Sequence, residues 1–477
     1  MGDLRVSEAE ARLAARVLDA LLREDYGRLS ARVARTKDGV RLTLFDGMVV
    51  RLVPGSLFQD FVVAPEERPR LGQVLATLER IADPADADGV AAFAAECRAA
   101  LEAVELHGRH AAEVLAAGPS YETLAAFLEH PVYPTSRARI GMGPDELLAY
   151  APEFGRSFAL RWVAAPGRAE PFPVHPLALG EALKIDGVRE IDGPATLVRA
   201  TLSTRTVQLG ARTQLKLPLP VSTLGARNRR SIKPGTLRDG ALAELLVREL
   251  ADPGVLVADE QTYAETGHEY LAWMLRRLPE GVIVPVAALN APGVLERLGD
   301  VLPGYLRLLL RWNVRLFVRY GVALEAHQQN LALVIGDGEP KLLVKDNDGL
   351  LASPSRLRAA GIEVPAFGDA RMLTDDPHAL ADVFVTITLH LAAAAVAFGA
   401  LPHARAARLL RDTLGEALDE HGDDPMARLL RARTLDAARL TGKSMITAGT
   451  LVSKERSGAR DVNKFYGSSG PNYLRRA

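Results

Sequence analysis

The residues best suited to chemistry flank a short apolar hairpin in the second half of the chain. Glu325-Ala-His-Gln-Gln-Asn330 precedes the hairpin, and Asp346-Asn-Asp-Gly349 follows it. Carboxylate and carboxamide oxygens are the hard ligands that magnesium prefers, and magnesium bridges phosphate oxygens. The imidazole of His327 can also donate to a phosphate. This pattern favours a site for a divalent metal and a triphosphate; a polar turn followed by solvated aspartates is the alternative.

A hydroxyl-rich turn that follows a predicted strand offers further donors for phosphate. It runs from Thr201 to Thr206 and sets three hydroxyls around one arginine. A guanidinium fork can bind two phosphate oxygens, while the hydroxyls donate to others. A solvated strand edge is the alternative. The phosphate-binding candidates of this turn are Ser203, Thr204, Arg205 and Thr206.

Two cations downstream of this turn would need anionic partners if they were buried. Lys216 is expected on a strand, and Arg227 ends the segment Thr223-Leu-Gly-Ala-Arg. A bound anion would supply the partner, and a solvated basic rim is the alternative. Three neighbouring cations are assigned to that rim, namely Arg229, Arg230 and Lys233.

Two histidines each precede a proline. His130 begins the segment His-Pro-Val-Tyr-Pro-Thr-Ser-Arg137, in which two prolines fix the backbone and hold both terminal side chains in a rigid loop. His175 is followed by Pro176. A stiff surface loop without a ligand is the alternative for the first segment, and a structural histidine for the second. The remaining histidines have no supporting spacing.

Composition and charge exclude several classes of protein. The 477 residues are enough for two or three domains, and a net charge of −1 argues against a general nucleic-acid or anionic-membrane binder. The single cysteine, Cys97, rules out a disulfide or a cysteine-rich metal site within the chain, and its Ala-rich helical context predicts a packing role. The longest apolar run, Leu391–Leu401, is too short for a membrane span. No apolar signal-peptide core is present, so a cytoplasmic protein is expected.

The elements that must position these residues divide the chain into three predicted regions. Residues 1–118 are mainly helical, residues 119–250 carry short β-type runs between Pro and Gly, and residues 251–477 are dominated by helices. Asp46-Gly47 between apolar runs predicts an early hairpin, and the tail after Lys443 is expected to be frayed. The predicted helices are 7–24, 68–82, 90–117, 294–302, 305–320, 377–399, 403–420 and 426–441. The predicted strands are 158–163, 195–203, 213–221, 331–335 and 341–345.

Taken in order, these motifs resemble the IucA/IucC family of NRPS-independent siderophore synthetases. The family has a His-Pro-x-His-Pro-x-x-Lys loop, a His-Pro segment, a Ser-x-Arg-Thr turn, Lys-Leu with a later Thr-x-x-x-Arg, Glu-x-His-x-Gln-Asn and an Asp turn ending in Gly. Tyr133 and Arg137 replace the second His and the Lys of the first motif, which bears on the acyl substrate more than on the nucleotide chemistry. The matching segments are His130 to Arg137, His175-Pro176, Ser203 to Thr206, Lys216-Leu217, Thr223 to Arg227, Glu325 to Asn330 and Asp346 to Gly349.

The resemblance implies an α+β enzyme of cupped, hand-like architecture. A helical thumb would span residues 1–118, antiparallel-sheet fingers residues 119–250, and a mostly helical palm residues 251–477. ATP and magnesium would bind between fingers and palm. A polycarboxylic acid such as citrate would be adenylated with release of pyrophosphate, and an amine or hydroxyl would then displace AMP. A homodimer is also plausible on this resemblance.

The resemblance also assigns roles to individual residues. The catalytic residues would be Lys216, Arg227 and His327. ATP would contact His130, Ser203, Thr204, Arg205, Thr206, Lys216, Arg227, His327 and Asn330. The acid substrate would contact Arg137, His175, Thr223 and Arg227. Magnesium would be held by Glu325, Asn330, Asp346 and Asp348.

Two other functions remain open from the residues. A small-molecule kinase would use the same acidic and histidine residues and release ADP rather than AMP. The chain lacks a convincing N-terminal Gly-rich phosphate loop with a following strand Lys, which weighs against a kinase. A degenerate, non-catalytic ligand-binding protein is the third possibility. The chain retains nearly all the charged motif residues, which weighs against it.

Overall fold

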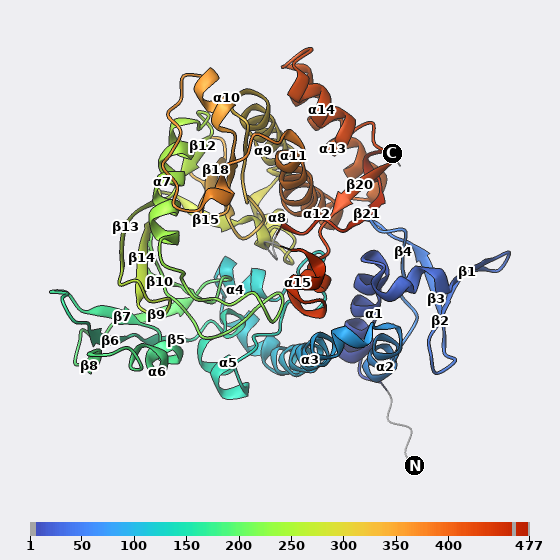
Figure 1. Ribbon diagram of the computed structural model, residues 1–477, viewed down its shortest axis with the longest axis horizontal. Helices are drawn as coiled ribbons and strands as arrows, with labels where there is room; N and C mark the ends of the chain where they lie inside the picture. Colours follow the sequence, from blue (N-terminus) through green and yellow to red (C-terminus); the bar gives the residue numbers. More distant parts are fainter. Residues whose placement is uncertain (1–5, 460–463, 476–477) are drawn as a thin grey trace.

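The chain has a mixed α+β fold, as expected, in which segments far apart in sequence enclose one central region (Figure 1). The structure is a computed structural model that describes residues 6–459 and 464–475. Residues 8–116 lie at the lower right of the view, residues 157–200 at the lower left, and residues 302–433 at the top. The predicted site residues lie between His130 and Asp348, outside the N-terminal part.

The N-terminal region combines helices with a small antiparallel sheet, as its hydrophobic pattern predicted. Ser7 accepts a hydrogen bond from the backbone N–H of Glu10 at 3.1 Å and thereby caps α1 (Glu8–Arg23). The predicted Asp46-Gly47 turn joins β2 to β3, and Gly47 has a φ of +87°, which glycine adopts without strain. Cys97 is buried in the core of this region, which confirms its packing role. The remaining elements are β1 (Val33–Thr36), β2 (Gly39–Thr43), β3 (Val49–Pro54), β4 (Phe61–Val63), α2 (Leu71–Ile81) and α3 (Ala87–Ala116).

A six-stranded antiparallel sheet carries the hydroxyl-rich turn and Lys216. Its order is β13-β14-β11-β10-β9-β5, so strands from both sides of residue 250 share one sheet, and the division into three regions stays a prediction. The register pairs Thr206 with Lys216, which fixes the turn beside the lysine. The strands are β5 (Ser157–Ala159), β9 (Leu197–Ala200), β10 (Thr206–Gly210), β11 (Thr213–Lys216), β13 (Asp259–Glu265) and β14 (Ala272–Arg277).

The predicted strand over 158–163 is in fact two strands in different sheets. Leu160 separates β5 from β6 (Arg161–Ala164), and β6 pairs instead with β7 (Phe172–Val174) and β8 (Arg189–Ile191). A continuous apolar pattern does not show where a strand changes sheet, because both halves are buried against neighbours that lie elsewhere in the sequence.

The apolar hairpin between the two acidic segments is confirmed, and its register explains their proximity. In β17 (Leu331–Ile335) and β18 (Lys341–Val344), Leu331 pairs with Val344. The backbone N–H of Lys345 then donates to the Asn330 carbonyl at 3.0 Å. The open end of the hairpin therefore brings the Glu325–Asn330 and Asp346–Gly349 segments together. Two further strands complete this sheet, β12 (Val255–Val257) and β15 (Val282–Pro285).

Helices cover the rest of the C-terminal region, and one apolar helix forms its centre. Residues Pro377–Ala400 are long and apolar enough to cross a membrane, but 78% of their most apolar window is buried inside the protein, as in the core helix of a globular protein. The sequence pattern predicted this helix over 377–399, although the uninterrupted apolar run Leu391–Leu401 marks only its end. The helices of this region are α8 (Val294–Leu298), α9 (Leu302–Arg315), α10 (Pro354–Ala359), α11 (Pro377–Val383), η8 (Phe384–Ala394), α12 (Ala395–Ala400), α13 (His403–Asp419) and α14 (Pro425–Arg433).

Two predictions for the C-terminus are wrong. The helix expected over 426–441 ends at Arg433, and Arg439–Gly442 forms strand β20 instead. The tail expected to fray pairs with it as β21 (Ser468–Pro471), and Tyr473 is fully buried, within hydrogen-bonding distance of His390 Nδ1 at 2.9 Å. Long-range strand pairing overrides the local Gly and Ser composition, which by itself favours disorder.

Candidate functional site

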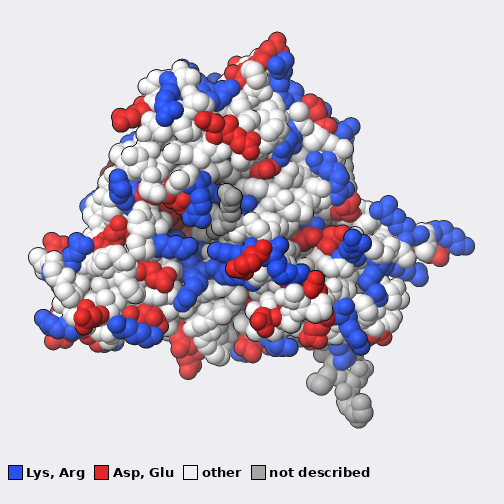
Figure 2. Space-filling model, in the orientation of Figure 1, with Lys and Arg blue, Asp and Glu red and all other residues white. Residues whose placement is uncertain are grey.

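A cavity of about 430 Å³ lies where the open end of the β17–β18 hairpin faces the hydroxyl-rich turn and Lys216. Figure 2 shows a hollow in the middle of this face, crossed by a band of Lys and Arg side chains. Most of the predicted site residues line this cavity, although they come from segments up to 218 residues apart. These are His130, Arg137, Ser203, Thr204, Arg205, Lys216, Thr223, Glu325, His327, Asn330, Asp346 and Asp348.

Lys216 and the two aspartates form the centre of the site. Lys216 Nζ lies 2.5 Å from Asp346 Oδ1 and 3.2 Å from Asp348 Oδ2, and the lysine side chain is only 2% exposed. Burial by itself would raise the pKa of Asp346, but the charges of Lys216 and Arg276 outweigh it and hold this pKa well below its usual value. Asp346 is therefore an ionised carboxylate in a weakly solvated site.

A buried ion pair behind the cavity holds the backbone of Asp346. The Glu260 carboxylate accepts the backbone N–H of Asp346 at 2.9 Å and the Nε–H of Arg276 at 2.5 Å. Asp346 has a φ of +61°, in the left-handed region that Asp and Asn tolerate better than most residues. This contact fixes an uncommon backbone geometry, and with it the direction of the Asp346 side chain.

The hydroxyl-rich turn is held from behind as well. Thr204, also left-handed at φ +64°, accepts a hydrogen bond from Arg139 Nε at 3.1 Å. Arg205 Nη1 donates to the Ser231 carbonyl at 2.9 Å, which leaves the rest of its guanidinium beside the cavity. Ser203 Oγ donates to Thr206 Oγ1 at 3.2 Å. The turn therefore presents Ser203, Thr204 and Arg205 to the cavity, whereas Thr206 supports them from below.

His130 and His327 are neutral donors directed at the cavity. Nδ1 of His130 accepts the backbone N–H groups of Val132 at 3.2 Å and Tyr133 at 3.0 Å, and Nδ1 of His327 accepts that of Gln329 at 3.3 Å. Each neutral ring must then carry its proton on Nε2. Burial is the main reason that the pKa of His130 is lowered to about 3 and that of His327 to about 4, and the charge of Lys443 contributes to both.

Three predicted residues do not line the cavity. Thr206 lies beneath the turn, Arg227 donates through Nη1 to the Ala448 carbonyl at 3.1 Å, and His175 is fully buried between the rings of Tyr150 and Phe158. The substrate role of His175 therefore has no support in the geometry, and its alternative as a structural histidine fits. Arg137 does line the cavity, but its Nη1 contacts His107 Nδ1 at 3.0 Å, so part of its guanidinium is already bound by the protein.

The burial of His175 makes a testable prediction for stability. Burial lowers its pKa to about 3, so below pH 6.5 the unfolded chain binds a proton that the folded protein does not. Stability falls as the pH drops through this window, by about 1.4 kcal/mol per pH unit for one such group. Asparagine can still accept the Leu177 N–H that His175 Nδ1 accepts at 3.1 Å. His175→Asn is expected to reduce the fall in unfolding free energy between pH 6.5 and 5 in urea titrations, whereas the exposed His403→Asn leaves it unchanged; equal slopes would contradict the prediction.

Several cavity residues were missed or misassigned from the sequence. Arg229, Arg230 and Lys233 all line the cavity; Arg229 and Lys233 are exposed at its mouth, but Arg230 is half-buried. Burial and then the charge of Arg205 lower the pKa of Arg230 to about 10, and its field reaches Asp346 and Glu325. The rim assignment was thus wrong for Arg230. Arg139, at the end of the proline-containing segment that begins with His130, also lines the cavity although no role was predicted for it, and Lys443 does so without any motif to indicate it.

The acidic residues fit a magnesium ion only together with phosphate. Throughout the part of the chain that the structure describes, no three His, Cys, Asp or Glu side chains are close enough to hold a metal by themselves. Magnesium is commonly bound by one or two carboxylates and substrate phosphates, which matches Asp346 and Asp348. Glu325 Oε2 lies so close to Gly349 that a Cβ there would come within 1.9 Å of it, so only glycine permits this approach. Asn330 Nδ2 joins the two segments by donating to the carbonyls of Glu325 at 3.0 Å and Asp346 at 3.4 Å.

Comparisons with known proteins agree with this architecture. Residues 120–169 match the IucA / IucC family, and residues 302–453 match the family described as ferric iron reductase FhuF-like transporter. An uncharacterized protein of Sinorhizobium fredii, y4xN, is 26% identical over 320 residues, a match that spans 47% of this chain and 50% of that protein. The chain thus spans about half the length of this curated relative.

Solved structures match over nearly the whole chain. The petrobactin biosynthesis protein AsbB of Bacillus anthracis has a TM-score of 0.77 at 17% identity, covering 98% of this chain and 96% of that one. ATP-bound aerobactin synthetase IucA of Klebsiella pneumoniae has 0.70 at 16%, covering 97% and 99%. Aerobactin synthetase IucC of the same organism has 0.65 at 19%, covering 91% and 96%. In sequence over residues 120–169 and in fold over almost its entire length, the chain is similar to the IucA/IucC family of siderophore synthetases, which confirms the resemblance that the ordered motifs indicated.

Proposed function

We propose that this protein is an ATP-dependent ligase that adenylates a carboxylate of a polycarboxylic acid and condenses it with an amine or a hydroxyl. The proposal rests on one observation: Lys216 Nζ lies within 3.2 Å of a carboxylate oxygen of Asp346 and of Asp348. The cavity that these residues line is also lined by Ser203 and Arg205 of the hydroxyl-rich turn. Cations, hydroxyls and carboxylates in one cavity suit a metal-bound triphosphate better than any other common ligand. The family resemblance supplies the reaction class, and the cupped, hand-like arrangement belongs to the same proposal.

Each group of cavity residues would have its own role in this reaction. Magnesium, held by Asp346 and Asp348 with Glu325 and Asn330 nearby, would supply neutralising charge to the phosphates. A substrate carboxylate oxygen attacks the α-phosphorus, the α–β phosphoanhydride bond breaks, and pyrophosphate leaves. Lys216, Arg205 and Arg230 stabilise the negative charge that builds on the phosphates. The amine or hydroxyl then attacks the acyl carbon, loses a proton and displaces AMP.

A screen for pyrophosphate release would test this proposal. Purified protein with ATP and magnesium is offered a panel of polycarboxylic acids, with and without amines or alcohols, and the nucleotide products are separated. AMP and pyrophosphate formed in a carboxylate-dependent way support the ligase, as would hydroxamate formation when hydroxylamine traps the acyl group. ADP as the nucleotide product would establish the small-molecule kinase instead. Absence of ATP·Mg binding by calorimetry would contradict the ligase and favour the non-catalytic ligand-binding protein.

The second matched family does not lead to a second proposal. A reductase with a cysteine-ligated iron centre would need several cysteines, and the chain has only Cys97, which is buried. We further propose a cytoplasmic enzyme whose partners are its small-molecule substrates, without nucleic acid or membrane, and which forms a homodimer. Size-exclusion chromatography with light scattering tests the dimer.

The donor assignment of His327 gives a prediction for ATP binding. Because Nε2–H faces the cavity, glutamine, whose amide nitrogen reaches that position, replaces the donor better than asparagine, whose shorter amide mimics Nδ1. A hydrogen bond to a charged group is worth about 1.5–3 kcal/mol, so His327→Asn is expected to weaken ATP·Mg binding by roughly 10- to 100-fold. His327→Gln is expected to retain several-fold more affinity in calorimetric titrations at pH 7.5.

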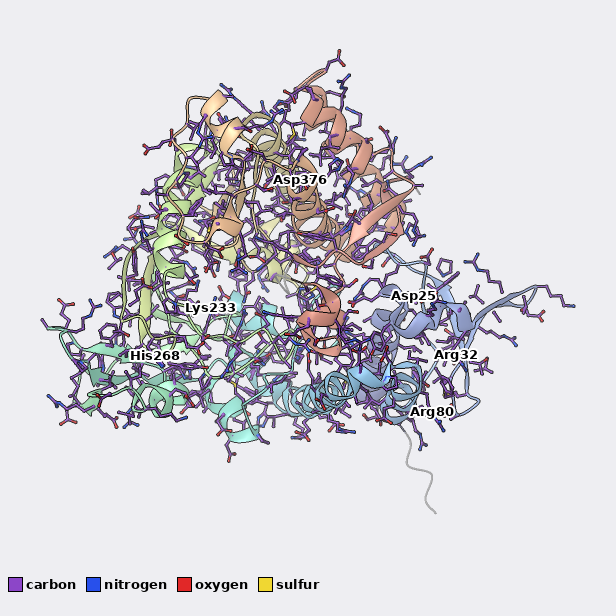
Figure 3. The ribbon with its side chains drawn as sticks, in the orientation of Figure 1. Asp25, Arg32, Arg80, Lys233, His268 and Asp376 are labelled. Atoms are coloured by element: carbon purple, nitrogen blue, oxygen red, sulfur yellow. The ribbon has the colours of Figure 1, made fainter. Side chains whose placement is uncertain are left out.

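His268 offers a matched control for this comparison. Its Nδ1 also accepts a backbone N–H, that of Tyr270 at 3.3 Å, but it is exposed and lies at the lower left of the molecule, outside the cavity (Figure 3). His268→Asn is expected to leave the affinity unchanged. Equal affinity of His327→Gln and His327→Asn would refute the tautomer and the role derived from it.

A further inference from the structure

A buried carboxylate that belongs to no motif joins three segments of the chain. Glu96, on α3, is only 1% exposed. Its Oε1 accepts the hydroxyls of Tyr133 at 2.8 Å and Thr135 at 2.6 Å, and its Oε2 accepts the hydroxyl of Thr450 at 3.0 Å. We call Glu96, Tyr133, Thr135 and Thr450 the Glu96 cluster. An ionised carboxylate only accepts hydrogen bonds, so it can accept all three of these hydroxyls on its two oxygens.

The Glu96 cluster fixes one wall of the cavity through the segment 443–451. Thr450 Oγ1 also accepts the backbone N–H of Ala226 at 3.0 Å, and the N–H of Arg227 donates to the Gly449 carbonyl at 3.1 Å. A second buried carboxylate, that of Glu24 at the C-terminal cap of α1, accepts the backbone N–H groups of Ile446 at 3.1 Å and Thr447 at 2.9 Å. The segment is thus tied to the N-terminal region at two points.

Close packing leaves this segment little freedom. A Cβ at Gly89 of α3 would meet the Leu451 carbonyl oxygen at 1.9 Å, and one at Gly225 would meet the backbone of Gly449 at 3.0 Å. The segment begins with Lys443 and includes Met445, both of which line the cavity. The charge of Lys443 also contributes to the lowered pKa of His130 and of His327.

The same cluster also holds the loop that carries His130. Tyr133, which stands where the family has its second histidine, is fully buried and lies three residues from His130. Its backbone N–H is one of the two that His130 Nδ1 accepts, and its carbonyl accepts Arg16 Nη2 at 2.9 Å. A displacement of Tyr133 therefore moves His130 directly, while a displacement of Thr450 moves Ala226 and the segment 443–451.

We propose that Glu96 is a positioning residue: from outside the cavity it holds the His130 loop and the segment 443–451 in register, and so sets the spacing of His130, His327 and Lys443 around the phosphates. It acts through Tyr133 and Thr450 and touches no substrate. No sequence motif indicates this role, because Glu96 lies in an Ala-rich helix. The expected effect of Glu96 on ATP binding rests on the proposed function, whereas its expected effect on the order of the segment 443–451 does not.

Two variants at opposite ends of one hydrogen bond provide the test. Glu96→Gln keeps the shape but turns one acceptor into a donor, and Thr450→Val keeps the shape but removes both bonds of the hydroxyl. Each is expected to raise the Kd for ATP·Mg by about tenfold, a loss typical of one charge-assisted hydrogen bond. The double variant is expected to lose no more than the worse single variant, because both break the same link. Hydrogen exchange of the amides of residues 446–451 is expected to be at least several-fold faster in all three.

Tyr26→Phe is the matched control. Tyr26 also donates to a buried carboxylate of the N-terminal region, Asp86 at 3.1 Å, but Asp86 contacts neither the His130 loop nor the segment 443–451. The control is expected to change the melting temperature alone. Variants that melt earlier but keep wild-type affinity would overturn the positioning role, as would unchanged exchange in residues 446–451. If the wild-type protein binds no ATP, the proposed function fails, yet exchange in this segment still decides whether Glu96 holds it.

Discussion

Replacing Asp346 by asparagine is expected to lower ATP-dependent pyrophosphate release by at least about a hundredfold, the loss commonly seen when one preorganised electrostatic group is removed from an active site. Asp346 is the carboxylate closest to Lys216, at 2.5 Å, and the one whose backbone is fixed by Glu260. Without its charge, Lys216 would keep only Asp348 as a partner, and the magnesium would lose one of two carboxylates. Both changes would weaken the neutralisation of charge on the same phosphates.

The substitution isolates the charge because asparagine tolerates the left-handed backbone at φ +61°. Asp25 provides the matched control: it is another left-handed aspartate, at φ +46°, on the opposite side of the view from Lys233 at the cavity (Figure 3). Asp25→Asn is expected to keep wild-type activity and stability. Steady-state pyrophosphate release over a range of magnesium concentrations measures the effect. Near-normal activity of Asp346→Asn would remove Asp346 from the site.

The second large effect is expected at Arg230. Its guanidinium lines the cavity, its Nε is buried, and its charge acts on Asp346 and Glu325. Arg230→Ala is therefore expected to reduce kcat/KM for ATP by roughly a hundredfold. Arg227, to which the family resemblance assigns the catalytic role, donates to the Ala448 carbonyl and does not line the cavity. Its assignment stays a prediction, and Arg227→Ala is expected to lose less activity than Arg230→Ala.

Arg229→Ala serves as the control for this pair. Arg229 lies between Arg227 and Arg230 in the sequence, is exposed, and donates to the Tyr270 hydroxyl at 2.9 Å. We expect its activity to change by less than about threefold, as for most exposed charges. The hydroxamate trap, run on all three variants, ranks them under identical conditions. A complete loss in Arg227→Ala with an active Arg230→Ala would favour the assignment from the resemblance over the one from geometry.

The sequence by itself determined the local architecture of the site. The alternating and apolar patterns located the hairpin of β17 and β18, and its Leu331–Val344 register necessarily joins the two acidic segments. Similarly, the turn and strand around Ser203 and Lys216 are neighbours because consecutive antiparallel strands pair. Residue type and spacing were enough to predict the hairpin contact, whereas β10 (Thr206–Gly210), which pairs with the strand of Lys216, was not among the predicted strands. The order of the motifs was also enough to indicate the family.

Only the tertiary structure shows which residues from distant parts of the chain contact the hairpin and the hydroxyl-rich turn. Lys216 and Asp346 are 130 residues apart, and their contact arises because two different sheets converge at one cavity. Neighbours that are distant in sequence determine the burial of Arg230, the contact of Arg227 with the Ala448 carbonyl, the packing of His175 between two aromatic rings, the pairing of β20 with β21 and the hydrogen bonds of Glu96. Residue type determines which interactions a side chain is able to make. Whether it makes them depends on its burial and its neighbours, because the energies of charges and hydrogen bonds depend on the surroundings that the folded chain supplies.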